Sequence, residues 1–176
     1  MKILHGLTGS VATNIALKFW ERYDTDSHEV SVVLTETSKN FYHCSETFNH
    51  GVYQDEDEWN HYKYHNEVLH IELVKKSDVL VIAPCSANTL AKIANGICDN
   101  LLTCVARAWD FKKPFIIAPS MNTNMITHPI YQQHIKTVES WGITVIPPQE
   151  KELFCGDYGL GAMANVDDII SRIESK

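Results

Sequence analysis

The amino-acid sequence predicts an α/β fold, in which one parallel β-sheet is covered by helices on both faces. Two observations support this prediction. Short apolar runs of strand length alternate along the chain with longer segments of helical pattern. The run at residues 78–84 is mostly apolar and rich in β-branched side chains, as is typical of a strand buried on both sides. Because 44% of the 176 residues are hydrophobic, the chain can bury one core, and residues 1–176 are predicted to form a single domain.

Each predicted strand is a short apolar run bounded by polar or turn-forming residues. The predicted strands cover residues 2–7, 29–35, 78–84, 114–119 and 143–148. A helix over residues 10–23 is predicted between the first two strands, because apolar residues recur there at helical spacing. The positions expected to share its buried face are Val11, Ile15, Ala16 and Phe19.

Later segments complete the predicted alternation. Helices are predicted around residues 131–141 and over residues 166–175, where Asp167 and Asp168 suit a first helical turn. Residues 44–67 are polar, aromatic and acidic without a clear period, so they are predicted to form a long excursion, which leaves room for a short helix. Within them, the four consecutive acidic residues at 55–58 are predicted to be a solvated loop.

The composition argues against several classes of protein. A net charge of −7 is unlike a nucleic-acid-binding surface, which normally carries a basic stripe. No apolar run approaches the roughly 20 residues that span a bilayer, and the first residues do not resemble a secretory signal. The five cysteines are odd in number and form no CxxC pair, which predicts reduced thiols and a cytoplasmic protein. His61, His65 and His70 lack ligand partners at suitable spacing, so no metal site is predicted.

Small polar residues follow the first two predicted strands, where a parallel sheet binds its ligands. Gly9 allows a tight turn and Ser10 can cap the next helix, but the sequence matches neither a Walker loop nor a dinucleotide fingerprint. The second strand is followed by hydroxyls at Thr35, Thr37 and Ser38. Glu36, between them, leaves a nicotinamide cofactor open as an alternative.

The next strand ends carry further polar groups. Ser86, Asn88 and Thr89 follow the third strand, although a helix cap needs only one of them, and together these ends predict a phosphorylated or heteroaromatic ligand. Asn122 follows the fourth strand, between two methionines, and an amide there needs a partner. His70 has apolar neighbours, a setting that is more typical of a packing residue than of a catalyst.

Several motifs occur together in one order along almost the whole chain. They are GSVA at 9–12, VLHIEL at 68–73, SANTLAKIANGICDNLLT at 86–103, RAWD at 107–110, PSMNTNM at 119–125 and CGDYGLGAMA at 155–164. Together they resemble the flavin-containing cysteine decarboxylases, and most closely the eukaryotic phosphopantothenoylcysteine decarboxylases of coenzyme A biosynthesis. Two positions depart from the usual pattern of that family: Ile126 replaces a tryptophan, which is expected to alter packing under the flavin or at a subunit interface, and Cys85 replaces a smaller or aliphatic residue.

The resemblance implies a flavodoxin-like or Rossmann-like doubly wound parallel sheet in three layers, with FMN as the cofactor. It also implies a homotrimer with active sites at subunit boundaries. The expected FMN contacts are Gly9, Ser10, Val11, Thr35, Thr37, Ser38, Ser86, Ala87, Asn88, Thr89 and Ala118.

The activity implied by the resemblance is the decarboxylation of 4'-phosphopantothenoylcysteine to 4'-phosphopantetheine, through transient thiol oxidation, CO2 loss and re-reduction of an enethiol. His70 and Cys155 would be catalytic, and Asn122, Gly156 and Met163 would bind the substrate. The glycine-rich residues 151–165 would form a flexible flap that carries the Cys155 thiol over the substrate.

Three alternatives remain open within this family, and each has a feature that separates it. A regulatory subunit of a protein phosphatase would typically carry long acidic or disordered extensions. A peptidyl-cysteine decarboxylase is less similar around RAWD and CGDYGLGAMA. Relatives of flavin prenyltransferase lack the cysteine-bearing flap.

Overall fold

The computed structural model describes residues 1–16, 28–42, 51–154, 156 and 158–175. Within these ranges the chain forms a six-stranded sheet in the order β3-β2-β1-β4-β5-β6, and every neighbouring pair is parallel. The strands are β1 (Lys2–Leu7), β2 (Glu29–Leu34), β3 (Val52–Tyr53), β4 (Val79–Cys85), β5 (Phe115–Pro119) and β6 (Thr144–Val145). The predicted α/β class is confirmed, although the last predicted strand shortens to two residues.

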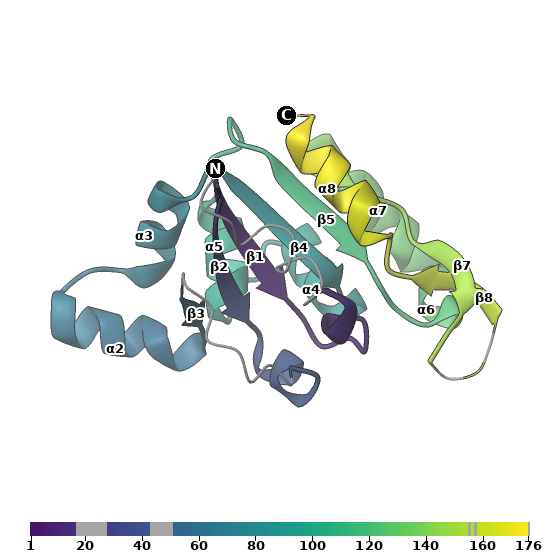
Figure 1. Cartoon of the computed structure of the whole chain (residues 1–176), viewed down its shortest axis with the longest axis horizontal. Coiled ribbons are helices and arrows are strands. Elements are labelled where there is room, and N and C mark those ends of the chain that lie inside the picture. The colour runs from purple at the N-terminus through teal and green to yellow at the C-terminus, as the bar shows by residue number, and fades with distance from the viewer. Residues whose placement is uncertain (17–27, 43–50, 155, 157, 176) are drawn as a thin grey trace.

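Helices cover both faces of this sheet and make three layers (Figure 1). One face packs against α3 (Leu69–Lys76), α4 (Ala87–Ala94), α5 (Leu101–Ala108) and α7 (Pro129–Ser140). The other face packs against the helical turn at residues 13–16 and against α8 (Val166–Glu174). Side chains of β4 alternate between the two cores, since Leu80 and Ile82 join the first while Val79 and Val81 join the second.

The strand order reverses between β1 and β4. From β1 the chain moves outward to β2 and β3, whereas from β4 it moves the other way to β5 and β6. Without the two-residue edge strand β3, this is the order of flavodoxin-like sheets. The loops that follow β1 and β4 therefore diverge and open a crevice at the carboxyl edge of the sheet.

The acidic residues 55–58 do not form a solvated loop, so that prediction was wrong. They form the first turn of α2 (Asp55–His65), none of whose residues is buried. Residues 55–65 show no hydrophobic period because this helix lies on the surface and has no apolar stripe facing the core. Its ends are capped instead, by reciprocal hydrogen bonds between Gln54 and Asp57 and by Asn66 in the left-handed conformation (φ 55°).

A two-stranded antiparallel hairpin lies outside the main sheet. It consists of β7 (Gln149–Glu152) and β8 (Tyr158–Ala162), and Figure 1 shows it beside the short helix α6 (Thr123–Ile126). The Met121 backbone N–H donates to the Gly161 carbonyl at 3.0 Å. Gly161 has φ +152°, and a Cβ there would collide with the Met121 carbonyl oxygen, so only glycine fits. The arms of the predicted flap are thus anchored at their base.

No helix within the described ranges is long and apolar enough to cross a membrane. The described residues also contain no group of three or more His, Cys, Asp or Glu side chains that could hold a metal ion.

Candidate active site

A cavity of about 1140 Å³ opens at the carboxyl edge of the sheet, where the strand order reverses. Its walls come from the loops after β1, β2, β4 and β5, from the β7–β8 hairpin, and from residues at the start of α2 (Asp55) and just before α5 (Asp99, Asn100). This volume exceeds the roughly 300–1000 Å³ of ordinary small-molecule pockets, so the cavity has room for two ligands side by side. A second cavity, of about 250 Å³, is lined mainly by apolar side chains and contains none of the predicted site residues.

Nine of the eleven predicted FMN contacts line the large cavity. They are Gly9, Ser10, Val11, Thr35, Thr37, Ser86, Ala87, Asn88 and Thr89. The other two do not line it. Ala118 is fully buried within β5, and the Ser38 hydroxyl is buried and donates to the Thr35 carbonyl at 2.6 Å.

The predicted apolar face of the first helix was wrong for two of its members. Val11 and Ile15 are 41% and 51% exposed and line the cavity, whereas Ala12 and Ala16 pack into the core. Residues 13–16 form a helical turn, and part of the apolar stripe faces the ligand cavity. Phe19 and the rest of the predicted helix after residue 16 lie outside the described residues. These side chains offer an apolar surface to a flat aromatic ligand.

The loops after β1 and β4 are held together by Thr8, which sequence reasoning missed. Thr8 is fully buried, and its Oγ1 donates to the Pro84 carbonyl at 2.8 Å and accepts the Ser86 backbone N–H at 2.8 Å. Nearby, the Ser10 and Ser120 hydroxyl oxygens lie 3.1 Å apart and join the loops after β1 and β5. In the sequence, the only indication of these contacts is that Thr8 and Ser120 directly follow the ends of strands.

The loop after β2 approaches the loop after β1 closely. A Cβ at Gly9 would lie only 2.5 Å from Thr37 Cγ2 and 2.8 Å from Thr37 Cβ, so the contact requires glycine. Thr35 precedes the 3₁₀ helix η1 (Glu36–Asn40) and lines the cavity. Its Oγ1 is buried and has no hydrogen-bond partner among the described residues. A polar atom in this state is satisfied when a ligand with a hydrogen-bonding group fills the cavity.

Helix α4 begins at the cavity wall. Ser86 caps it, because the Ser86 Oγ accepts the Thr89 backbone N–H at 3.3 Å. The first N–H groups of a helix carry partial positive charge and favour an anionic group such as a phosphate. Lys92, on the same helix, also lines the cavity, but both carboxylate oxygens of Asp99 lie 2.8 Å from its Nζ.

Asn122 lies on the wall formed by β5 and the hairpin. It is half-buried, caps α6 and accepts the Asn124 backbone N–H through Oδ1 at 2.9 Å. Of the other predicted substrate contacts, Met163 lines the cavity, whereas Gly156 is exposed in the hairpin tip and does not. Ile126 is buried in the core and does not line the cavity.

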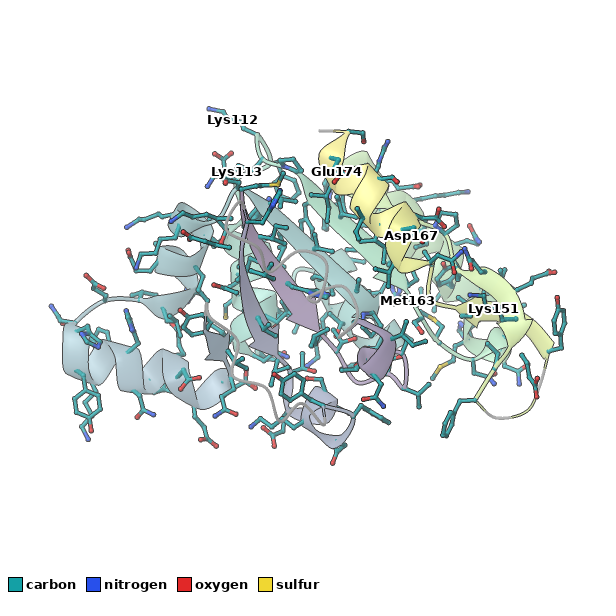
Figure 2. The ribbon with its side chains drawn as sticks, viewed as in Figure 1. Lys112, Lys113, Lys151, Met163, Asp167 and Glu174 are labelled. Carbon is teal, nitrogen blue, oxygen red and sulfur yellow. The ribbon has the colours of Figure 1, made fainter. Side chains whose placement is uncertain are left out.

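The hairpin supplies a cation to the same wall. Lys151 lines the cavity, and its Nζ donates to the Asn165 Oδ1 at 2.9 Å. Figure 2 shows Lys151 and Met163 on this side of the molecule, whereas Lys112 and Lys113 lie at the opposite edge. Cys155, in the hairpin tip, lies outside the described residues.

His70 is not brought to the cavity within its own chain. It lies near the start of α3, and Figure 1 shows α3 and α6 at opposite ends of the sheet. The apolar sequence neighbours of His70 did not indicate its polar partner in space. Its Nδ1 lies 2.8 Å from the Glu58 Oε1.

Comparisons with known proteins identify the family of this chain. A family model described as Flavoprotein matches residues 1–176. The chain is 44% identical to phosphopantothenoylcysteine decarboxylase of Mus musculus, over 99% of this chain and 86% of the relative. It is 48% identical to the protein of that name from Oryza sativa subsp. japonica, over 98% of this chain and 79% of the relative.

Solved structures give the same result. A cysteine mutant of PPC decarboxylase complexed with pantothenoylaminoethenethiol superposes with a TM-score of 0.90 and 45% identity, covering 99% of this chain and 96% of that chain. The FMN-binding protein AtHal3 superposes with a TM-score of 0.86 and 47% identity, covering 99% and 95%.

The flavodoxin-like sheet and the hydroxyl-lined cavity at its reversal point define a flavin-binding class of protein. Within that class, the chain belongs to the flavoprotein family, and curated relatives that share 44–48% of its sequence are phosphopantothenoylcysteine decarboxylases.

Proposed function

We propose that this chain binds FMN and decarboxylates 4'-phosphopantothenoylcysteine to 4'-phosphopantetheine. The observation that carries the proposal is one cavity in which nine predicted FMN contacts share walls with Asn122 and Met163. Identity of 44–48% to phosphopantothenoylcysteine decarboxylases over nearly the whole chain supports the same reaction.

The residues of the cavity fit FMN. The unsatisfied Thr35 hydroxyl, the close approach at Gly9 and the N-terminus of α4 suit a ligand that is flat at one end and phosphorylated at the other. Val11 and Ile15 offer apolar surface to an isoalloxazine ring. When bound, FMN supplies reversible hydride acceptance, which lets the thiol-bearing carbon of the substrate be oxidised and later reduced.

The reaction needs this oxidation because the substrate carboxylate is attached to a saturated carbon. Once the thiol has become a thioaldehyde, the electrons of the breaking C–C bond can move onto sulfur, and CO2 leaves an enethiolate. Return of the hydride and addition of two protons, one to carbon and one to sulfur, then give 4'-phosphopantetheine, so the overall reaction consumes no external oxidant.

The chain's own residues bind the substrate and move protons. Asn122 holds the substrate carboxylate by donating from its amide NH2 group, whose orientation is fixed because Oδ1 accepts the Asn124 N–H. His70 assists the oxidation and CO2-loss steps as a base or as a charged partner of the carboxylate. Cys155 gives the final proton, and closure of the hairpin tip excludes water from the enethiolate.

We also propose that the working unit is a cytosolic homotrimer with active sites at the subunit boundaries. The separation of α3 from α6, which Asn122 caps, supports this proposal. His70 would serve the cavity of a neighbouring copy, because helix α3 is distant from Asn122 of the same chain.

The Thr35→Val substitution is expected to weaken FMN binding without lowering the thermal stability of the FMN-free protein. Valine keeps the side-chain shape and removes a buried Oγ1 that has no partner among the described residues. The FMN-free variant should unfold at or above the wild-type temperature, since an unpaired buried hydroxyl costs about 1–3 kcal/mol. The FMN dissociation constant should rise roughly two- to tenfold through loss of one hydrogen bond. Fluorescence titration and thermal melts of the FMN-free protein measure the two effects.

Thr13→Val is the matched control, because the buried Thr13 hydroxyl donates to the Thr8 carbonyl at 3.0 Å. Removing a satisfied hydroxyl should lower the melting temperature. Wild-type FMN affinity in the Thr35→Val variant would contradict the proposed contact.

The function itself is tested by the visible spectrum of the purified protein and by CO2 collection after addition of 4'-phosphopantothenoylcysteine. The protein should carry flavin absorbance and release CO2 with formation of 4'-phosphopantetheine. A peptide ending in cysteine should release none, and if it reacted instead, the chain would be a peptidyl-cysteine decarboxylase. Flavin absorbance without turnover would favour the phosphatase-subunit alternative, and a protein that cannot be reconstituted with FMN would contradict the cofactor assignment.

A further inference from the structure

Glu58 contacts His70 with both of its carboxylate oxygens. Oε1 lies 2.8 Å from the His70 Nδ1, and Oε2 accepts the His70 backbone N–H at 3.0 Å. The two side chains are only 24% and 18% exposed, so this pair is partly shielded from water. An exposed pair of this kind would contribute little to stability. A partly buried contact at two points, however, fixes the imidazole ring relative to its own backbone.

One of these two contacts has a structural explanation. His70 is the second residue of α3, and the N-cap residue Val68 has no side-chain hydrogen bond to give. The Glu58 carboxylate takes the place of the missing cap, as an anion accepting a first-turn N–H. Asp55 likewise accepts a first-turn N–H of α5, that of Leu101 at 2.8 Å, although Asn100 also caps that helix.

Capping of α3 does not require the other contact, between the Glu58 Oε1 and the His70 imidazole. An ionised carboxylate only accepts hydrogen bonds, so the Nδ1 of His70 must carry the hydrogen that it shares with Oε1. In the neutral ring Nε2 then holds the lone pair. No hydrogen bond to Nε2 is present among the described residues.

We propose that Glu58 is a positioning residue that sets the tautomer of His70, so that Nε2 is the atom that exchanges protons with the substrate. This inference rests on the proposed decarboxylase function and on the catalytic role assigned to His70 there. Glu58 itself touches neither substrate nor cofactor, and it acts by holding Nδ1–H and by stabilising the ring when Nε2 takes up a proton.

The Glu58→Gln variant separates positioning from capping. Glutamine keeps one carbonyl oxygen for the His70 backbone N–H and places an NH2 donor beside Nδ1, which must then accept. The hydrogen should move to Nε2, and ¹⁵N NMR of the labelled histidine rings should report this exchange directly. We expect kcat to fall roughly a hundredfold or more, as when a carboxylate that orients a catalytic histidine is replaced by its amide. KM and the melting temperature should stay near the wild-type values.

Glu56→Gln is the control, since Glu56 is exposed in the same helical turn and the substitution removes the same charge. It should leave both the tautomer and kcat unchanged. The proposal is overturned if Glu58→Gln keeps the wild-type tautomer, or if its kcat equals that of Glu56→Gln. If His70→Asn turned over normally, the catalytic role of His70 would fail instead, and the NMR result would still show whether Glu58 sets the tautomer.

Discussion

Replacing His70 with asparagine is expected to abolish CO2 release while leaving FMN bound. The side chain does not line the cavity of its own chain, so cofactor binding should be intact. Asparagine cannot take up a proton near neutral pH, and loss of a general base typically costs about 10²- to 10⁴-fold in rate. The measurement is CO2 released per flavin on addition of 4'-phosphopantothenoylcysteine. Normal turnover would mean that His70 only packs against Glu58.

Mixed assemblies give this prediction a sharper control. The His70→Asn and Asn122→Ala variants should each be inactive alone, because each lacks one part of the site. If neighbouring copies contribute these two residues, co-expression of both variants should restore about a quarter of the sites in a randomly mixed ring. No recovery in assemblies that contain both variants would place His70 and Asn122 in a site within one chain and contradict the interfacial arrangement.

The Cys155→Ser variant should release CO2 and then stop. Serine is a far weaker acid than cysteine, so the final protonation should slow severely while the earlier steps proceed. The expected products are an enethiol that carries two hydrogens fewer than 4'-phosphopantetheine and a flavin whose absorbance stays bleached. Mass spectrometry and stopped-flow absorbance measure the two.

Cys98→Ser is the matched control, because Cys98 is an exposed free cysteine outside the hairpin. It should produce 4'-phosphopantetheine at the wild-type rate. Full product formation by Cys155→Ser would show that another group donates the proton, and failure to release CO2 would place Cys155 in an earlier step.

The sheet and most of the cavity wall could be predicted from the sequence for one physical reason. Buried parallel strands need uninterrupted apolar runs, and those runs mark where each strand ends. Since all carboxyl ends meet at one edge of the sheet, polar residues directly after the runs fall together in space. Gly9, Thr37 and Asn88 are separated along the chain and yet line one cavity for this reason.

Contacts between distant segments could not be predicted in this way. Helix α2 buries no residue, so it leaves no hydrophobic period to find, and its acidic first turn serves other helices. Thr8 is bonded to Pro84, 76 residues away, through a partner that only the folded sheet supplies. Val11 and Ile15 show the converse case, because an apolar period does not tell whether its face meets the core or a ligand.

The double hydrogen bond of Thr8 has a consequence for affinity. Together with the Ser10–Ser120 contact, it joins the loops that follow three neighbouring strands before any ligand arrives. These loops therefore lose their conformational entropy when the chain folds, not when the ligand binds. A ligand that enters this preorganised cleft keeps more of its gross interaction energy as net binding free energy.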